Sequence, residues 1–473
     1  MDSDTNAILA SKERERERER EREMATAHVL VIPFPAQGHV NPMMLLSRKL
    51  VKYGFKITFV NTEIIHKRVE GALDSLVDSN INLVSIPDGL GAEDDRNDLG
   101  KLCETMLHTM PEKLEELINN INASNGDDKI SCIVADAGMG WAIEVGNKMG
   151  IKGAVFWFAA AASLALQVSI PSLIDDGIID SDGIPTQKQV IQPLPGMPAM
   201  DAAYISWYRI GDSASQKIFF KYTQQYMQTL KFADWWLCNT VPELEPVTFS
   251  LAPKLLPIGP LMSSKHTEDT VGQFWQVDHS CLNWLDQQQP CSVVYVAFGS
   301  FTVFDPTQFK ELALGLELTN RPFLWVVRPD ILNRSRNAYT NEFQGTHGKI
   351  IGWAPQTKVL NHPAIACFIS HCGWNSSIEG VSNGVPFLCW PYFADQFLDR
   401  IYICDVWKVG LGFELDENGI VLREEVKRKV DQLLGDEGIR ARSLELKKML
   451  MNNIADNGQS SKNFNNFIQW LKA

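Results

Sequence analysis

Short apolar runs that alternate with helical stretches constrain the fold of this chain more than any other feature. Runs that are apolar on both faces are typical of strands in a parallel sheet, because helices cover both faces of such a sheet. Their alternation with helices predicts an α/β fold with doubly wound sheets. We expect a helix after the Asn41-Pro42 pair, one capped by Asp305-Pro306, strands at residues 28–33, 56–60, 81–86, 130–135, 235–239, 293–298, 323–327, 349–351, 367–370 and 387–389, and further helices at 102–121, 141–149, 215–230, 423–434, 439–454 and 460–471.

The length of 473 residues suggests more than one domain, and the two halves of the pattern are similar. A stretch with Pro257, Gly259 and Pro260, followed by polar residues, resembles a linker. Prolines also interrupt residues 175–212, which we interpret as a long loop. We expect one Rossmann-like domain at 24–252, a linker at 253–276, a second Rossmann-like domain at 277–455 and a final helix within 456–473.

Residues 1–23 form a charged extension in which Glu and Arg alternate strictly from Lys12 to Glu23, just before Met24. A mixed-charge repeat without apolar residues cannot build a core, so a disordered segment or a solvated helix are both compatible with it. A translated dinucleotide repeat upstream of a start at Met24 is the interpretation we favour. We expect deletion of residues 1–23 to leave activity unchanged.

Composition and charge argue against some classes of binding partner. The net charge of −13 argues against nucleic acid or an anionic membrane, and no apolar run reaches the roughly 18 residues that span a bilayer. Nine scattered cysteines without a CxxC pair indicate reduced thiols, so we expect a cytoplasmic protein. We also expect a monomer. We expect no metal site, because no second close pair completes Cys367 and Cys372, and Asp180-Ser181-Asp182 follows no strand.

The segment from Ala366 to Val381 suits a phosphate group. An apolar run ends at Ser370, His371-Cys372-Gly373 turns the chain, and a helix begins at Asn375-Ser376. Glycine allows close approach of the backbone, and a helix N-terminus presents unpaired N–H groups with a partial positive charge. His371 adds a side-chain donor beside this turn.

Glu379 within this segment, and three side chains on either side of it, suit the remaining parts of a nucleotide-sugar. Trp353 offers a flat face for a base, and Glu379 can accept hydrogen bonds from ribose hydroxyls. Asp395 and Gln396 offer a carboxylate and an amide to sugar hydroxyls. The alternative is an ordinary βα unit of a Rossmann-like domain.

The 44-residue segment from Trp353 to Gln396 resembles the signature box of plant UDP-dependent glycosyltransferases. The resemblance extends over nearly all of the chain from Met24 and implies two Rossmann-like domains that face each other across a cleft, the GT-B type. It implies that residues 24–252 bind the acceptor and residues 277–455 bind the UDP-sugar donor. It implies no cofactor, only a UDP-sugar co-substrate. The residues that it assigns to donor binding are Ser300, Trp353, Ala354, Gln356, His371, Trp374, Asn375, Ser376, Glu379, Asp395 and Gln396.

His39 and Asp136 each follow a predicted strand of the first half, where ligands of open α/β sheets bind. A histidine can remove a proton from a hydroxyl, and an aspartate on its far ring nitrogen would fix the tautomer. The resembling family uses a His–Asp pair at these positions. A loop histidine bonded to backbone and a helix-capping aspartate are the structural alternatives.

Together these residues predict transfer of a sugar from UDP to a hydroxyl or carboxyl of a small lipophilic acceptor, with inversion to a β-glycoside. In the resembling family a glutamine at the position of Gln396 goes with glucose donors, so we expect UDP-glucose. We place Trp141, Phe156 and Phe158 in the acceptor pocket, with the loop from Gly196 to Trp207. The run Ala159–Ala162 stands where the family often has a Ser or Thr that reaches the donor.

Three other functions are alternatives to transfer of glucose from UDP-glucose. The same fold could use another UDP-sugar, or it could bind UDP-sugars or small molecules without catalysis. A nicotinamide or flavin oxidoreductase would need a G-x-G-x-x-G turn after a strand. Gly138-Met139-Gly140 and Gly410-Leu411-Gly412 both lack the third glycine.

Overall fold

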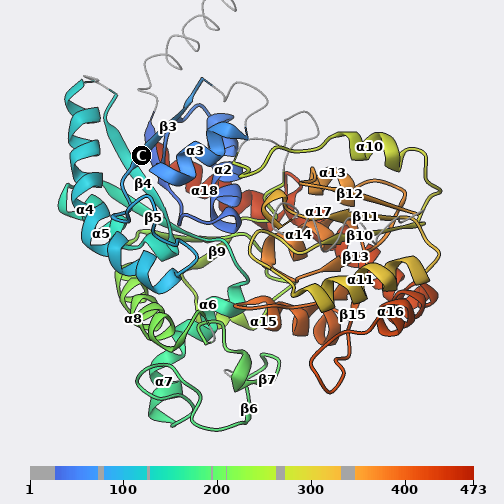
Figure 1. Cartoon of the computed structure of the whole chain (residues 1–473). Helices are drawn as coiled ribbons and strands as arrows, with labels where there is room; N and C mark the ends of the chain where they lie inside the picture. The colour runs from blue at the N-terminus through green and yellow to red at the C-terminus, as the bar shows by residue number, and fades with distance from the viewer. Residues whose placement is uncertain are drawn as a thin grey trace, which may run out of the picture.

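The computed structural model describes residues 27–72, 79–124, 128–192, 195–208, 210–262, 272–331 and 347–473. The extension 1–23 lies outside these residues. The described residues form two α/β halves side by side, each with its own parallel sheet (Figure 1). The predicted fold class is therefore confirmed.

The first sheet has seven parallel strands, in the order β3-β2-β1-β4-β5-β8-β9. Every residue of β1 is buried, and its four residues after His28 are apolar, as expected for a strand covered on both faces. Because β1 pairs with β4, the loops that follow these two strands meet at one edge of the sheet. The strands are β1 (His28–Ile32), β2 (Lys56–Thr62), β3 (Ile81–Ile86), β4 (Ile130–Asp136), β5 (Lys152–Trp157), β8 (Trp235–Cys238) and β9 (Leu255–Pro257).

Helices cover both faces of this sheet. They are α2 (Gln37–Val51), α3 (Glu63–Gly71), α4 (Leu99–Ser124), α5 (Trp141–Lys148), α6 (Ala161–Val168), α7 (Ile170–Asp175), α8 (Ser213–Thr229) and α9 (Thr248–Leu251), with short 3₁₀ turns η1 (Ala137–Met139), η2 (Ala202–Tyr204) and η3 (Leu230–Phe232). The predicted loop at 175–212 contains a two-stranded hairpin of β6 (Val190–Ile191) and β7 (Met200–Asp201).

Helix α2 begins earlier than the sequence pattern suggested. The sequence predicts Asn41 as the cap and Pro42 in the first turn, but the helix starts at Gln37 and Pro42 lies inside it. A proline within a helix has no N–H to give to the carbonyl four residues back. The carbonyl of Gly38 is therefore left without its helical donor, and another group must satisfy it.

The second sheet has six parallel strands, in the order β12-β11-β10-β13-β14-β15. Asp305 caps α11 by accepting the N–H groups of Thr307 and Gln308, as predicted. The strands are β10 (Val293–Ala297), β11 (Phe323–Val326), β12 (Gly348–Ile351), β13 (Ile365–Ser370), β14 (Phe387–Cys389) and β15 (Gly410–Gly412). The helices are α10 (Ser280–Leu285), α11 (Pro306–Leu318), α13 (Gln356–Leu360), α14 (Trp374–Asn383), α15 (Gln396–Ile401), the π-helical η4 (Tyr402–Val406), α16 (Arg423–Gly435) and α17 (Glu437–Ile454).

The segment predicted as a linker starts with a strand of the first sheet. β9 pairs with β8 at the sheet edge, where Pro257 is tolerated because an edge strand need not donate from every N–H. The chain crosses to the second half only after this strand.

The last helix, α18 (Gln459–Lys472), returns to the first half (Figure 1). Its apolar face packs into the core that also contains residues of β1, β2 and β8. Asn463 donates a hydrogen bond to the carbonyl of Pro257, 2.8 Å away. The buried residues of this face are Phe464, Phe467, Ile468 and Leu471.

Candidate active site

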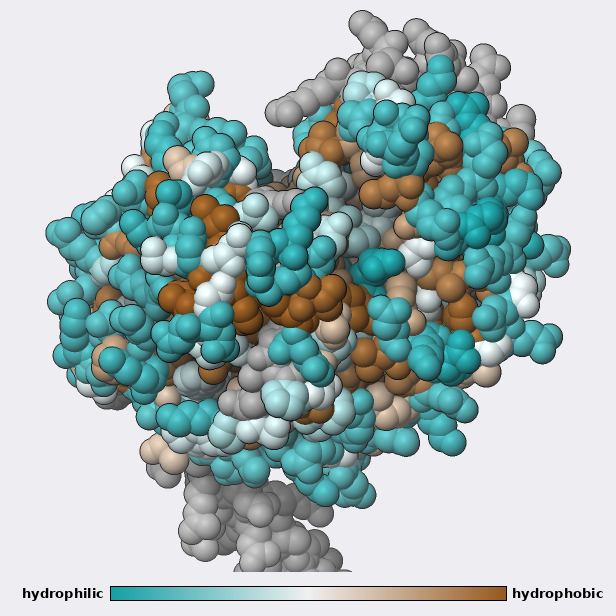
Figure 2. Space-filling model, turned by 90° about the horizontal axis from the view of Figure 1, so that it is seen from below, coloured by the Kyte–Doolittle hydropathy of each residue, from teal (hydrophilic) through white to brown (hydrophobic). Residues whose placement is uncertain are grey.

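A cavity of about 320 Å³ is lined by residues of both halves. On the face of the molecule in Figure 2, hydrophobic residues gather along the middle and hydrophilic ones dominate the periphery. The ends of β1, β10 and β13 all deliver residues to the cavity wall, as expected for ligands at the carboxyl edges of open α/β sheets.

His39 and Asp136 form a hydrogen-bonded pair in the first half. His39 Nδ1 lies 2.8 Å from Asp136 Oδ2, and the other oxygen of Asp136 accepts the N–H of Gly138 at 2.8 Å. Asp136 is fully buried, whereas the His39 side chain is 20% exposed and lines the cavity. Because a carboxylate only accepts hydrogen bonds, Nδ1 carries the proton and Nε2 presents its lone pair.

Two aromatic rings hold the imidazole in place. The ring of Phe158 lies 3.6 Å from that of His39 between centroids, and Phe34 packs at 4.9 Å. Asp136 caps the turn at Gly138 as well as bonding to His39, so it combines the two alternatives that the sequence left open.

The turn predicted to hold the phosphates, residues 371–373 (the phosphate turn), is built around His371. Its ring lies against two glycines: a Cβ added at Gly299 or at Gly373 would stand 2.6 Å from His371 Nε2. Gly299 also has a φ of +65°, which disfavours other residues. Burial lowers the pKa of His371 to about 4, so the imidazole is neutral near pH 7 and acts as a hydrogen-bonding group rather than a cation.

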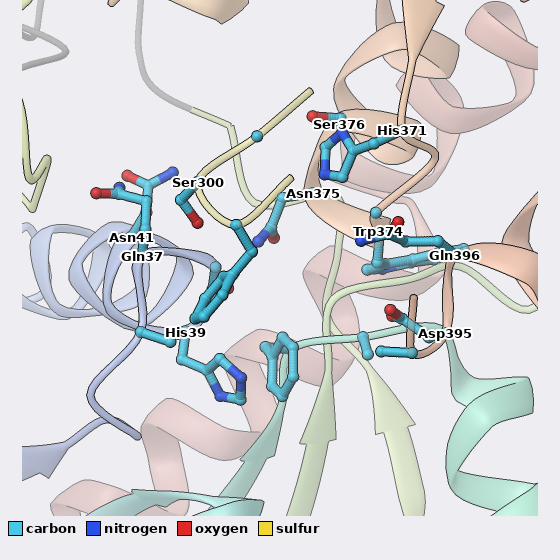
Figure 3. Close-up of a pocket in the computed structure, with 18 of the residues that line it drawn as sticks. Gln37, His39, Asn41, Ser300, His371, Trp374, Asn375, Ser376, Asp395 and Gln396 are labelled. Carbon is cyan, nitrogen blue, oxygen red and sulfur yellow. The ribbon is translucent and has the colours of Figure 1, made fainter. Parts of the chain in front are cut away.

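Two contacts hold this turn against the first half. Asn375 Nδ2 donates to the carbonyl of Gly38, the one left free by Pro42, at 2.6 Å. Trp374 Nε1 donates to the carbonyl of Asn239 at 2.9 Å. Figure 3 shows His39 and Asn375 approaching the same space from opposite halves.

The nucleoside end is ordered by side-chain hydrogen bonds. Glu379 accepts from Gln356 Nε2 at 2.7 Å and from Thr357 Oγ1 at 2.9 Å. Trp353 donates its indole N–H to Gln273 and packs 4.6 Å from Trp275 between ring centroids. Glu379 and Gln356 both line the cavity, so this hydrogen-bonded group forms part of its wall.

The sugar end contains Asp395 and Gln396. Gln396 Oε1 accepts the N–H groups of Tyr392 at 2.8 Å and Phe393 at 3.1 Å, which fixes the amide with its NH₂ as the remaining donor. Burial raises the pKa of Asp395 to about 6, and a backbone hydrogen bond opposes that rise. Asp395 and His39 both line the cavity.

All eleven residues assigned to the donor line this one cavity. Sequence reasoning did not find the first-half and linker residues that join them, namely Gln37, Asn41 and Gln273. Gln37 donates to Gln273 at 3.1 Å across 236 positions of sequence. No sequence periodicity signals a contact of that kind.

The acceptor side differs from the prediction at two positions. Phe158 lines the cavity, but Phe156 and Trp141 do not. Successive residues of β5 face opposite sides of the sheet, so Phe156 packs in the core beneath α18 while Trp157 lines the cavity. Trp141 begins α5 and is buried in the core of the first half. The wall that replaces them is mostly aromatic or apolar and includes Phe34, Leu99, Trp157, Trp207, Ile210, Phe219, Tyr222 and Tyr226.

The polar groups of this wall are few. Tyr226 donates to Gln167 Oε1, and Tyr222 donates to the carbonyl of Gly138, next to the His39–Asp136 pair. Phe219, Tyr222 and Tyr226 recur at helical spacing on α8, which is the signal that could have identified them. The acceptor half therefore suits an apolar, ring-containing molecule with few polar groups.

The Asp180-Ser181-Asp182 motif has a structural role here. Asp180 accepts the N–H groups of Asp182 and Ile184 in a turn, and Asp182 pairs with Lys217 at 2.8 Å. Across the described ranges, no group of three or more His, Cys, Asp or Glu side chains could hold a metal ion. Within the same ranges, no helix is both long enough and apolar enough to cross a bilayer.

Comparisons with known proteins agree with this site. The family model described as UDP-glucoronosyl and UDP-glucosyl transferase matches residues 270–446, and that of a glycosyltransferase N-terminal domain matches residues 25–88. UDP-glycosyltransferase 83A1 of Arabidopsis thaliana is 48% identical over 94% of this chain and 97% of its own. The 7-deoxyloganetin glucosyltransferase of Catharanthus roseus is 33% identical over 94% and 96%, respectively.

Among solved structures, Os79 from O. sativa in complex with UDP superposes with a TM-score of 0.76 at 27% identity. The match covers 94% of this chain and 100% of that one. The same protein in complex with U2F and trichothecene gives a TM-score of 0.73 at 28% identity, with the same coverage. Sequence and structure together show that the chain belongs to the UDP-glycosyltransferase family.

Proposed function

We propose that this enzyme transfers glucose from UDP-glucose to a hydroxyl of a small lipophilic acceptor, with inversion to a β-glucoside. One observation carries the proposal: His39, which is hydrogen-bonded to the buried Asp136, lines the same cavity as His371, Asp395 and Gln396. That arrangement supports a base on one side of a hexose and a diphosphate on the other.

In the proposed reaction, His39 Nε2 removes the proton of the acceptor hydroxyl as its oxygen attacks the anomeric carbon. Asp136 stabilises the imidazolium that forms. Attack from the face opposite UDP breaks the bond to the diphosphate and inverts the anomeric centre. The imidazolium later releases its proton to solvent.

The negative charge that develops on the leaving diphosphate needs preorganised donors. The N-terminus of α14 supplies unpaired N–H groups and a partial positive charge. His371 and Ser300 line the same part of the cavity and add side-chain donors. We therefore propose that the reaction uses no metal ion and no cofactor beyond the UDP-sugar.

The acceptor class is supported by the apolar wall around His39 and by the relatives. Linamarin synthase 1 of Manihot esculenta and (R)-mandelonitrile beta-glucosyltransferase of Prunus dulcis are both 34% identical to this chain. By analogy we propose a neutral alcohol or phenol of phenolic, flavonoid, terpenoid or hormone type. A carboxyl acceptor is the second candidate, since the same base position accommodates it.

We propose UDP-glucose as the donor because Gln396 presents an NH₂ group beside Asp395, so that one donor and one acceptor face the sugar. We further propose that the enzyme works as a monomer in the cytosol, which is supported by nine free cysteines.

The test is a panel of alcohols, phenols and carboxylic acids incubated with UDP-glucose, with UDP-galactose as the matched donor. Product mass identifies transfer, and the NMR coupling of the anomeric proton gives the configuration. We expect β-glucosides of neutral hydroxyls and a higher kcat/KM for UDP-glucose. An α-linked product, or preference for UDP-galactose, would contradict the proposal.

A further inference from the structure

The Asn375–Gly38 hydrogen bond joins the two chemical ends of the site. Gly38 immediately precedes His39, the proposed base, and Asn375 lies in the first turn of α14, whose N-terminus faces the diphosphate. The bond is 2.6 Å long and joins residues that are 337 positions apart in the sequence. Its acceptor is the backbone carbonyl of Gly38.

A backbone carbonyl inside a helix is normally occupied by the N–H four residues further on. For Gly38 that residue is Pro42, which has no N–H. The carbonyl is thus available to Asn375 only because residue 42 is proline. A partly buried carbonyl left unsatisfied would be costly, so the two features depend on each other.

The carboxamide of Asn375 has two N–H donors. One is used by Gly38, and the other remains for a diphosphate oxygen at the N-terminus of α14. We propose that Pro42 is a positioning residue: by freeing the Gly38 carbonyl it lets Asn375 hold the turn that carries the base at a fixed spacing from the leaving group. This inference relies on the proposed roles of His39 and of the phosphate turn.

The direct test is Pro42→Ala, which restores an N–H at position 42 and closes the helical bond to Gly38. The N–H at position 42 and the carboxamide of Asn375 then compete for the Gly38 carbonyl, and Asn375 loses part of its anchor. Alanine is favourable in a helix, so α2 is expected to keep or gain thermal stability. We expect kcat to fall about threefold to tenfold, the usual effect of one hydrogen bond, with a smaller change in the KM of the acceptor.

Pro111→Ala is the matched control, because Pro111 also lies inside a helix, α4, and does not line the cavity. It is expected to leave kcat unchanged. If Pro111→Ala and Pro42→Ala change kcat to the same extent, the effect is not specific to Gly38 and the proposal is overturned.

A double-mutant cycle with Asn375→Ala isolates the contact. In the Asn375→Ala background the Gly38 carbonyl has no side-chain partner, so adding Pro42→Ala should leave kcat unchanged. If Pro42→Ala lowers kcat in the Asn375→Ala background as much as it does in the wild type, the proposal is contradicted. If Pro42→Ala has the kcat of the wild type while His39→Ala shows the large loss expected for a general base, the positioning role is rejected and the proposed function remains intact.

Discussion

His39 Nδ1 lies 2.8 Å from Asp136 Oδ2, and the second oxygen of that carboxylate is held by the Gly138 N–H. Asp136 is the last residue of β4, and His39 lies in the first turn of α2, the helix that follows the neighbouring strand β1. The geometry leaves His39 Nε2 as the free nitrogen that faces the cavity.

Replacement of His39 by alanine is expected to lower kcat by a factor on the order of 10²–10⁴, because a general base contributes about that much. Asp136→Asn should also lower kcat strongly, since an amide can donate to Nδ1 and move the imidazole proton to Nε2. Initial rates at saturating UDP-glucose measure both. His66→Ala removes a half-buried histidine that pairs with Glu70 and does not line the cavity, and it is the control. Normal turnover in His39→Ala would rule out the base.

Gly373→Ala should weaken donor binding. Its Cβ would stand 2.6 Å from His371 Nε2, so the imidazole must shift out of the phosphate turn. Overpacking costs about 1–3 kcal/mol, which corresponds to a rise of roughly tenfold or more in the KM for UDP-glucose. Gly435→Ala, at the end of α16, meets no neighbouring atom within 4 Å and is the control. Equal KM values for the two variants would contradict the packing argument.

The affinity for UDP-glucose is expected to fall in acid because of Asp395. Burial raises the pKa of this carboxyl to about 6, so below that pH it is protonated in the empty enzyme and accepts fewer sugar hydroxyls. KM should therefore rise as pH drops from 7 to 5. Asp395→Asn removes the titration, so its KM should be higher at pH 7 and change less with pH. The same pH slope in both proteins would exclude Asp395 as the cause.

Phe467→Ala should destabilise the first half although residue 467 is near the C-terminus. Phe467 is fully buried and its ring lies 5.7 Å from that of Trp235. Loss of a buried phenylalanine costs about 3–5 kcal/mol. Thermal unfolding followed by circular dichroism should show a lower midpoint than in Leu444→Ala, where the side chain is half exposed. Coincident midpoints would show that α18 contributes little.

The fold and the donor end of the site could be predicted because they depend on local pattern. His39 follows β1 in the first turn of α2, Asp136 ends β4, and one continuous segment carries Trp353, Glu379 and Gln396. The assignments of chemical role to these residues stay predictions until variants are measured.

The acceptor wall could not be predicted in the same way. Its error arose at β5, where no strand had been predicted: without the strand's register, neighbouring residues Phe156 and Trp157 cannot be assigned to opposite faces. Gly299 illustrates a second limit. Its requirement becomes visible only when the His371 ring, from another strand, is seen to occupy the space of a Cβ.

The position of α18 has a consequence for biosynthesis. The sheet that contains β1 is the earliest to leave the ribosome, yet its apolar face is covered by residues 464–471, which are among the last. Domains usually fold as they emerge, N-terminal first. Part of the core of the first half is therefore expected to stay open to solvent until residues 464–471 have been synthesised. Truncated chains that lack the final helix are expected to aggregate and to require chaperones.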